Sequence, residues 1–456
     1  MRGIARISAA MAATVILLVP AIWNRFPLLE HDTGGYLARW FEGTLVVSRS
    51  TVYALFALIL THPDLWPIVI AQAALTVFVL MLTLRALGFD RRAGMLLAVT
   101  ALLSAFTTLA WLTSIVLTDI FAGIAVLAVY LLIFAPDTLR RWERVALFVL
   151  LAFAISTHGA TLVMVTGLVA AAALAWKIWR IGAIRGIAQG AAALVVGAVM
   201  LLAANFVVAG QVAWTPGAAW FAFGRMLSDG IVARYLDDHC PNPRLKLCAH
   251  RHELPTDADS FFWSGPESVF NRLGRFAGLG DEMNTILVES LREYPAWQIK
   301  AALRATGRQL VTVATGEGVE DTIWHTYGII ERYEPSVAAD MRAAKQQQGE
   351  VDFTTFNRIH VPVALISMVL LVPLFVVGLR RERFADLGTL AATLAVALLA
   401  NAFVCGAMSN PHDRYGARLA WLPPLLMLLV AWRLNEQRQN APARRRPAIA
   451  AIDAGS

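Results

Sequence analysis

The chemically most informative residues of this sequence are ionisable side chains that stand beside apolar segments. Glu30, Asp32 and Asp119 are acids in short loops or at the start of an apolar run. A carboxylate at such a place can accept a proton from a hydroxyl group as a general base. Asp32, in a local turn close to the surface, fits that role best. Glu30, Asp119 and His158 could hold a metal ion or an acceptor molecule.

Cationic side chains accompany these acids. Arg49, Arg414 and Arg418 could each pair with a phosphate, whose oxygens match a guanidinium in a bidentate way. His412, in the run Asn410-Pro-His-Asp-Arg-Tyr415, is a further candidate for substrate binding. A base together with cations for a phosphate leaving group is typical of group transfer from a phosphorylated donor. The alternative for every one of these residues is structural: a solvated loop acid, a helix cap or an ordinary ion pair.

The composition excludes most soluble classes. The chain is 58% hydrophobic and 16% charged, with a mean hydropathy of +0.59, whereas soluble domains are about a quarter charged. The net charge of +7 does not indicate nucleic-acid binding, because the Lys and Arg residues cluster between apolar segments and no nucleic-acid-binding motif is present. The sequence therefore predicts a polytopic membrane protein.

We expect an all-α fold with ten transmembrane helices, since a span needs about 20 apolar residues. Residues 7–24 are read as a retained helix rather than a cleaved signal peptide, because Pro20–Trp23 offers no small-x-small cleavage site. The predicted spans are 7–24, 66–86, 93–110, 117–135, 143–157, 159–176, 187–209, 360–379, 386–408 and 418–433.

The distribution of basic residues predicts the orientation. Of the 39 Lys and Arg residues, 19 fall in the loops and ends on one side of this layout and 5 in the short loops on the other. The remaining 15 lie in the long segment 210–358. They do not bear on the orientation, because long loops are translocated across the membrane regardless of their charge. Both termini are thus expected in the cytoplasm of a bacterial-type inner membrane, with every candidate site residue on the extracytoplasmic face.

Four regions follow from this layout. Residues 1–209 form a transmembrane module whose first outer loop, 25–65, contains a short helix that Asp32 or Thr33 could cap. Residues 210–358 form a mainly helical extracytoplasmic domain, whose aromatic residues are either its core or an acceptor platform. Residues 359–434 hold the last helices, and 435–456 a disordered cytoplasmic tail. Cys240 and Cys248 are expected to form a disulfide in an oxidising compartment; the alternative is two free thiols.

The acid-bearing outer loop resembles that of the GT-C superfamily of polyprenyl-phosphate-dependent glycosyltransferases. Glu30-His-Asp-Thr-Gly-Gly-Tyr36 occupies the place of the catalytic acid, with Asp32 as its best match. Leu117-Thr-Asp-Ile-Phe121 matches a second acid at the outer start of a later helix. Arg49-Ser-Thr-Val-Tyr53 resembles the basic and aromatic segment of the family, which implies substrate binding by Arg49 and Tyr53. Asn410–Tyr415 resembles late loop motifs near the donor phosphate.

The resemblance implies a membrane glycosyltransferase that takes a sugar from a polyprenyl-phosphate donor. The acceptor would be a lipid-linked or cell-envelope glycan such as lipopolysaccharide. A divalent metal stays open, since the family's adjacent acidic pair is Glu-His-Asp here. Three alternatives also stay open: an O-antigen ligase or polymerase with a diphosphate donor, a lipid or glycan transporter, and a membrane-anchored assembly protein.

Overall fold

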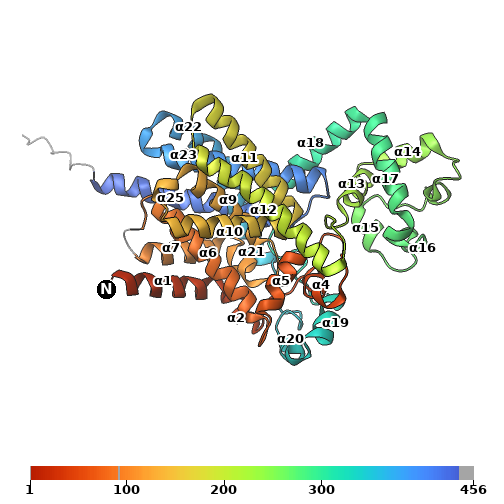
Figure 1. The fold of residues 1–456 in the computed structure, drawn as a ribbon, viewed down its shortest axis with the longest axis horizontal. Coiled ribbons are helices and arrows are strands. Elements are labelled where there is room, and N and C mark those ends of the chain that lie inside the picture. Colours follow the sequence, from red (N-terminus) through yellow and green to blue (C-terminus); the bar gives the residue numbers. More distant parts are fainter. Residues whose placement is uncertain (1, 91–92, 441–456) are drawn as a thin grey trace, which may run out of the picture.

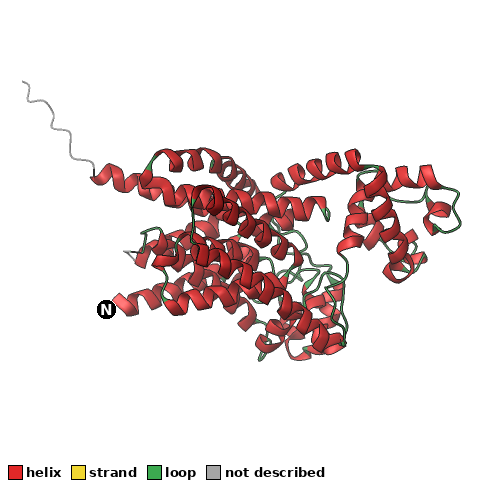
Figure 2. Ribbon diagram, turned by 45° about the horizontal axis from the view of Figure 1, so that its top comes forward, coloured by secondary structure: helices red, strands yellow, loops and turns green. Residues whose placement is uncertain are grey.

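The computed structural model describes residues 2–90 and 93–440, and within these ranges the chain forms helices and no strand. The tail predicted at 435–456 lies mostly outside the described residues. Figures 1 and 2 show long helices that run side by side, with a smaller group of helices at one end.

Every predicted span coincides with a helix or a pair of consecutive helices. These are α1 (Arg2–Leu17) with α2 (Val19–Asn24), α6 (Trp66–Ala86), α7 (Ala93–Phe106), α9 (Ile120–Phe134), α10 (Arg141–Thr157), α11 (Gly159–Trp179), α12 (Ile184–Ala209), α21 (Thr354–Val369) with α22 (Leu371–Arg380), α23 (Ala385–Ala402) with the π-turn η5 (Phe403–Ala407), and α24 (Asp413–Ala420) with α25 (Leu422–Asn440).

Six of these are long and apolar enough to cross a membrane: 66–86, 159–179, 184–209, 354–380, 382–407 and 413–439. The described residues therefore form an all-α membrane protein with six candidate spans. The other four predicted segments give shorter helices. Near the N-terminus, for example, Pro20 stands in the first turn of α2, and α1 ends just before it at Leu17.

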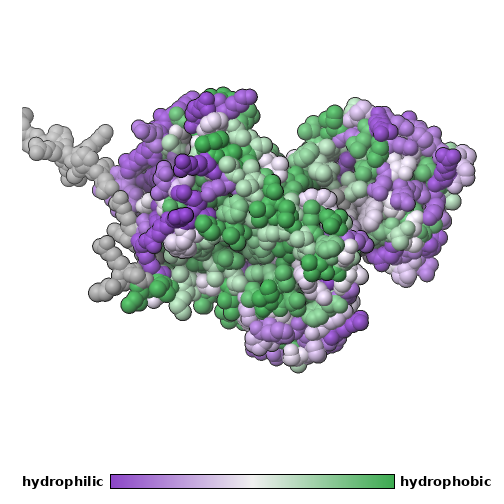
Figure 3. All heavy atoms as spheres, viewed as in Figure 1, coloured by the Kyte–Doolittle hydropathy of each residue, from purple (hydrophilic) through white to green (hydrophobic). Residues whose placement is uncertain are grey.

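Helix α9 forms the centre of the bundle. Every residue from Ile120 to Ile133 is buried, which is the expectation for a helix that is apolar on all sides. Helices α12 and α21 lie at the periphery and expose apolar side chains such as Val199, Phe206 and Ile366. In Figure 3 such residues make up the hydrophobic band across the middle of the molecule, as lipid contact requires.

The basic loops meet at one end of the bundle, the end where Figure 1 marks the N-terminus. Arg6 pairs with Asp90 at 3.1 Å, and Arg433 pairs with Asp386 at 2.7 Å. Arg433 also donates to the carbonyl oxygen of Leu87 at 2.6 Å. These contacts join the ends of α1, α6, α23 and α25, so the loops that carry most of the counted basic residues lie on one face.

Shorter elements cover the opposite end. They are α3 (Thr33–Leu37), α4 (Arg39–Glu42), α5 (Thr51–Leu60), α8 (Leu109–Ser114), α19 (Trp324–Tyr333), η3 (Pro335–Val337) and α20 (Ala338–Ala343). Helix α5 is capped by Ser50, whose hydroxyl accepts from the amides of Val52 and Tyr53. The side chain of Asp32 does not cap α3, because it is engaged by arginines.

Segment 210–358 contributes to two hydrophobic cores. The first part has a core of its own around Phe223, Phe262 and Met283. It comprises α13 (Ala218–Ser228), α14 (Ile231–His239), η2 (Lys246–His250), α15 (Ala258–Trp263), α16 (Val269–Arg272), α17 (Arg275–Glu293) and α18 (Pro295–Val311). Beyond it, Ile330 of α19 and Met341 of α20 pack into the core of the bundle.

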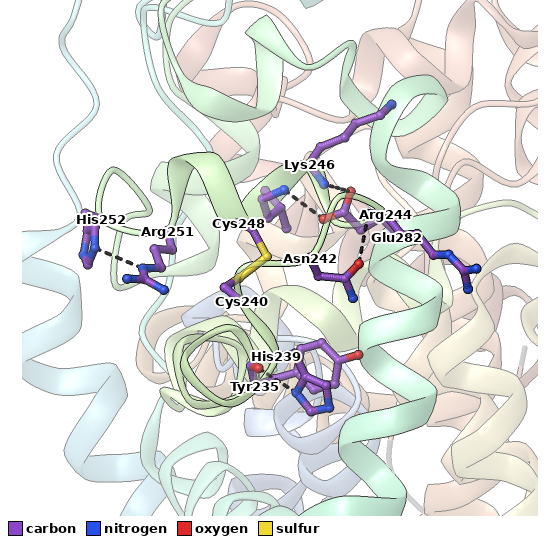
Figure 4. Close-up of a disulfide and its surroundings, with 11 residues drawn as sticks. Tyr235, His239, Cys240, Asn242, Arg244, Lys246, Cys248, Arg251, His252 and Glu282 are labelled. Carbon is purple, nitrogen blue, oxygen red and sulfur yellow. Dashed lines mark hydrogen bonds between the residues drawn. A yellow bond between two sulfur atoms is a disulfide. The ribbon is translucent and has the colours of Figure 1, made fainter.

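A disulfide closes the loop between α14 and η2. Cys240 and Cys248 are joined with their Cα atoms 5.6 Å apart. Figure 4 shows the neighbouring carboxylate of Glu282 from α17, which accepts from the amides of Lys246 and Leu247, each at 2.9 Å. The disulfide thus closes the loop, and the hydrogen bonds to Glu282 hold it to α17, the longest helix of this domain.

Candidate functional site

A short backbone pairing brings loop 25–65 against the start of α9. Leu28 and Ile115 form an isolated parallel bridge, in which Leu28 N donates to Ser114 O at 2.9 Å and Val116 N donates to Leu28 O at 3.0 Å. The hydroxyl of Thr33 then donates to Val116 O at 3.0 Å. These bonds hold residues 28–33 beside residues 114–119, although more than 80 residues separate them in the chain.

Three acids converge on the side chain of Arg414, which lies in α24. Its Nη1 donates to Glu30 Oε1 at 2.9 Å and to Asp32 Oδ2 at 2.7 Å, and its Nε donates to Asp119 Oδ2 at 2.8 Å. Arg49 pairs with the other oxygen of Asp32. We call Glu30, Asp32, Asp119, Arg49 and Arg414 the acid–arginine cluster. The structure thus brings five of the sequence-predicted residues into direct contact.

Asp32 and Arg49 form the accessible side of the cluster. Each side chain is 18% exposed, compared with 5% for Glu30 and 2% for Asp119. The guanidinium of Arg49 lies over the ring of Tyr36, with 5.7 Å between its Cζ and the ring centroid. A molecule that approaches from outside would therefore meet Asp32 and Arg49 first.

The two acids of the first loop differ in proton affinity. Burial raises the pKa of Glu30 to about 8, against the opposing charge of Arg414. Burial acts in the same direction on Asp32, but Arg49 and Arg414 together hold the pKa of Asp32 at about 2. Asp32 therefore stays ionised at neutral pH, while Glu30 can take up a proton.

Glu317 completes the surroundings of Arg414, and the sequence reasoning missed it. Its carboxylate accepts from the backbone amide of Arg414 at 2.7 Å and contacts Nδ1 of His412 at 2.7 Å. This contact raises the pKa of His412 despite its burial. Glu317 is flanked by Gly316 and Gly318, both with positive φ. An acid between two glycines was the one sequence signal that could have revealed it.

His412 also connects the cluster to the helical domain. Its backbone is held by Gln309 of α18, which accepts from His412 N at 3.0 Å and donates to His412 O at 2.8 Å. Its Nε2 lies 3.6 Å from Asp259 Oδ2 of α15. Asp413 accepts from the amide of Ala314 at 2.7 Å. Segment 309–317 and α24 are thus fixed to each other directly beside Arg414.

Three further residues predicted for substrate binding are occupied by structural contacts. Tyr53 is fully buried and donates to Gln72 Oε1 at 2.9 Å. Arg418 is also fully buried and donates through Nε to Asn401 Oδ1 at 2.8 Å. His158 caps the start of α11, where its Nδ1 accepts from the amide of Ala160 at 3.1 Å. Burial lowers the pKa of His158 to about 3, so it is neutral at pH 7.

The arrangement of acids does not fit a metal ion. Among the residues that the structure describes, no three His, Cys, Asp or Glu side chains are grouped so that they could hold one. Glu30, Asp32 and Asp119 instead share the guanidinium of Arg414, which supplies the positive charge that a cation would otherwise provide. We therefore derive no step through a metal.

The chain matches no protein-family model, no curated protein and no solved structure. The site is thus interpreted from its own geometry: one accessible carboxylate held between two guanidinium groups, at the end of an apolar helical bundle opposite its basic loops.

Proposed function

We propose that this protein is a membrane glycosyltransferase that moves a sugar from a polyprenyl-phosphate donor to a lipid-linked or cell-envelope glycan. The observation that carries the proposal is the position of Asp32 between Arg49 and Arg414. A proton acceptor thus lies in direct contact with two guanidinium groups that are suited to binding phosphate.

The proposed reaction uses each member in a distinct role. The carboxylate of Asp32 accepts the proton of the acceptor hydroxyl, whose oxygen forms a bond to the anomeric carbon of the sugar. The bond between that carbon and the phosphate oxygen breaks, and its electrons leave with the lipid phosphate. Arg49 and Arg414 stabilise the negative charge of the departing phosphate.

The ion pairs that are present before substrate binds impose an order on the proposed steps. Arg49 and Arg414 keep the pKa of Asp32 at about 2, which makes it a weak base before substrate binds. A donor phosphate competes for the same guanidinium groups. Once it draws them away from Asp32, the pKa of that carboxyl rises toward its ordinary value and its basicity increases. Donor binding would therefore prepare the base.

The surroundings support a lipid-borne donor. The flanks of the bundle are apolar (Figure 3). The cluster lies at one end of this bundle, so a polyprenyl chain could lie along the helices while its phosphate reaches Arg49. As part of the proposal, ten segments cross an inner membrane, both termini are cytoplasmic, and the cluster faces the extracytoplasmic side. The excess of basic residues on the side of the termini, 19 against 5 on the other side, favours that orientation.

A transfer assay with purified protein in lipid nanodiscs tests the proposal. A labelled sugar on polyprenyl phosphate would be the donor, and a lipid extract from the host envelope the source of acceptor. Asp32→Asn should lower the rate at least about a hundredfold, as expected for loss of a general base. The control is Asp237→Asn, an exposed acid of α14, which should keep full activity. Full activity of Asp32→Asn in folded protein would overturn the assignment.

A further inference from the structure

A cavity lies at the other end of the bundle, among the basic loops. It has a volume of about 250 Å³ and is bounded by α1, α6, α7 and the start of α10. Its walls are apolar and include Phe78, Met81, Phe89 and Leu96. Its polar lining consists of Arg6, Arg85, Asp90, Arg140 and Glu143. The cavity therefore combines a hydrophobic interior with a charged rim.

The charges on the rim leave an excess of positive charge. Arg6 is paired with Asp90, and both terminal nitrogens of Arg85 bond to Glu143. The side chain of Arg140 is exposed and makes no ion pair with any residue that the structure describes. In addition, Arg85 Nε is buried and lacks a hydrogen-bond partner within the same residues. The Nε of Arg85 is closed to solvent, so on this rim the exposed side chain of Arg140 is the group available to an anion.

The apolar walls continue onto the flank of the bundle. Trp142 at the rim is 55% exposed, and its ring centroid lies 5.9 Å from that of Phe78. Helix α1 exposes Ile7 and Met11 close to Arg6 and Ala9, which line the cavity. Tryptophan at the rim of an apolar surface is typical of the level where headgroups meet acyl chains.

We propose that this cavity binds a phospholipid with a negatively charged headgroup from the leaflet on the side of the basic loops. The phosphate accepts hydrogen bonds from Arg140, and an acyl chain lies along the apolar surface that Phe78 and Trp142 form. A soluble phosphate would leave the apolar walls uncovered, whereas a zwitterionic lipid would not neutralise the charge of Arg140. This site is separate from the acid–arginine cluster and does not depend on the proposed transfer reaction.

Native mass spectrometry of the purified full-length protein tests the site. Phosphatidylglycerol should bind more tightly than phosphatidylcholine, and Arg140→Gln should weaken phosphatidylglycerol binding about fivefold, the effect typical of one basic residue near a lipid surface. The matched control is Arg141→Gln, the neighbouring exposed arginine, which does not line the cavity and should leave binding unchanged. Equal losses in both variants would show only general attraction of anionic lipid and would overturn the proposal.

A fluorescence experiment keeps the test independent of Arg140. Brominated phosphatidylglycerol should quench the wild-type protein more than Trp142→Phe, because bromine quenches tryptophan on contact. Quenching of Trp142 that does not distinguish brominated phosphatidylglycerol from brominated phosphatidylcholine would contradict a headgroup-specific site. Displacement of phosphatidylglycerol by millimolar glycerol phosphate would show that the site takes a soluble phosphate, which would also overturn the proposal.

Discussion

Replacement of Arg414 by glutamine tests whether one guanidinium neutralises the cluster. Arg414 is 13% exposed and contacts Glu30, Asp32 and Asp119 within 2.9 Å. Its removal leaves Asp119, which is 2% exposed, without its ion-pair partner. Loss of one partner of a buried ion pair costs about 3–5 kcal/mol. We therefore expect Arg414→Gln to lower the free energy of unfolding by about that amount.

The effect of Arg414→Gln should depend on pH. Arg414 lowers the pKa of Glu30, so its removal favours protonated Glu30 further. A folded-state pKa above the ordinary value means that stability is retained at low pH and lost as pH rises through the folded pKa. The wild-type pKa of Glu30 is about 8. The variant should therefore be destabilised more at pH 9 than at pH 6.

Unfolding in sodium dodecyl sulfate, followed by tryptophan fluorescence, would measure these free energies. Arg234→Gln is the control, since Arg234 pairs with Asp238 at 2.9 Å on the exposed face of α14 and should cost below about 1 kcal/mol. Asp119→Asn in the Arg414→Gln background should recover about 1–3 kcal/mol, as contacting residues couple. Strictly additive effects of the two substitutions would refute the reasoning.

Three further predictions concern other parts of the account. Glu30→Gln should flatten the loss of stability between about pH 4.5 and 8, measured by the same unfolding titration; an unchanged slope would contradict a raised pKa. Gly123→Ala should cost about 1–3 kcal/mol, because its Cβ would lie 2.6 Å from the ring of the fully buried Trp421, between α24 and α25; wild-type stability would show that α9 and Trp421 are packed less closely. A cysteine at Ser264 should react with an impermeant maleimide in intact cells and one at Thr138 only after permeabilisation; the reverse pattern would invert the proposed topology.

The sequence predicts the helical segments well because membrane helices are determined by local hydrophobicity. It also predicts five members of the site, since ionisable groups at the ends of apolar segments are conspicuous. The direction in which each side chain points is harder to predict from the sequence. Arg414 and Arg418 stand one helical turn apart, yet only Arg414 contacts the acids, whereas Arg418 turns toward Asn401 and Cys405.

Long-range contacts within the soluble segment could not be predicted. Glu317 reaches Arg414 because segment 312–323 folds back onto the bundle, and nothing in the local pattern indicates that return. Tyr53 is likewise predicted to bind substrate, but it is buried and packs edge-on against Tyr36 with ring centroids 5.1 Å apart. Both outcomes depend on tertiary packing, which periodicity and composition do not encode.

The most direct test of the central claim is the mass profile of the envelope glycans and glycolipids of the host, compared between a deletion strain and strains complemented with wild type or Asp32→Asn. The account predicts that deletion removes one sugar mass from one glycan or lipid class, and that wild type but not Asp32→Asn restores it. An unchanged profile in the deletion strain, with the protein normally expressed in its parent, would contradict a glycosyltransferase and favour transport or assembly.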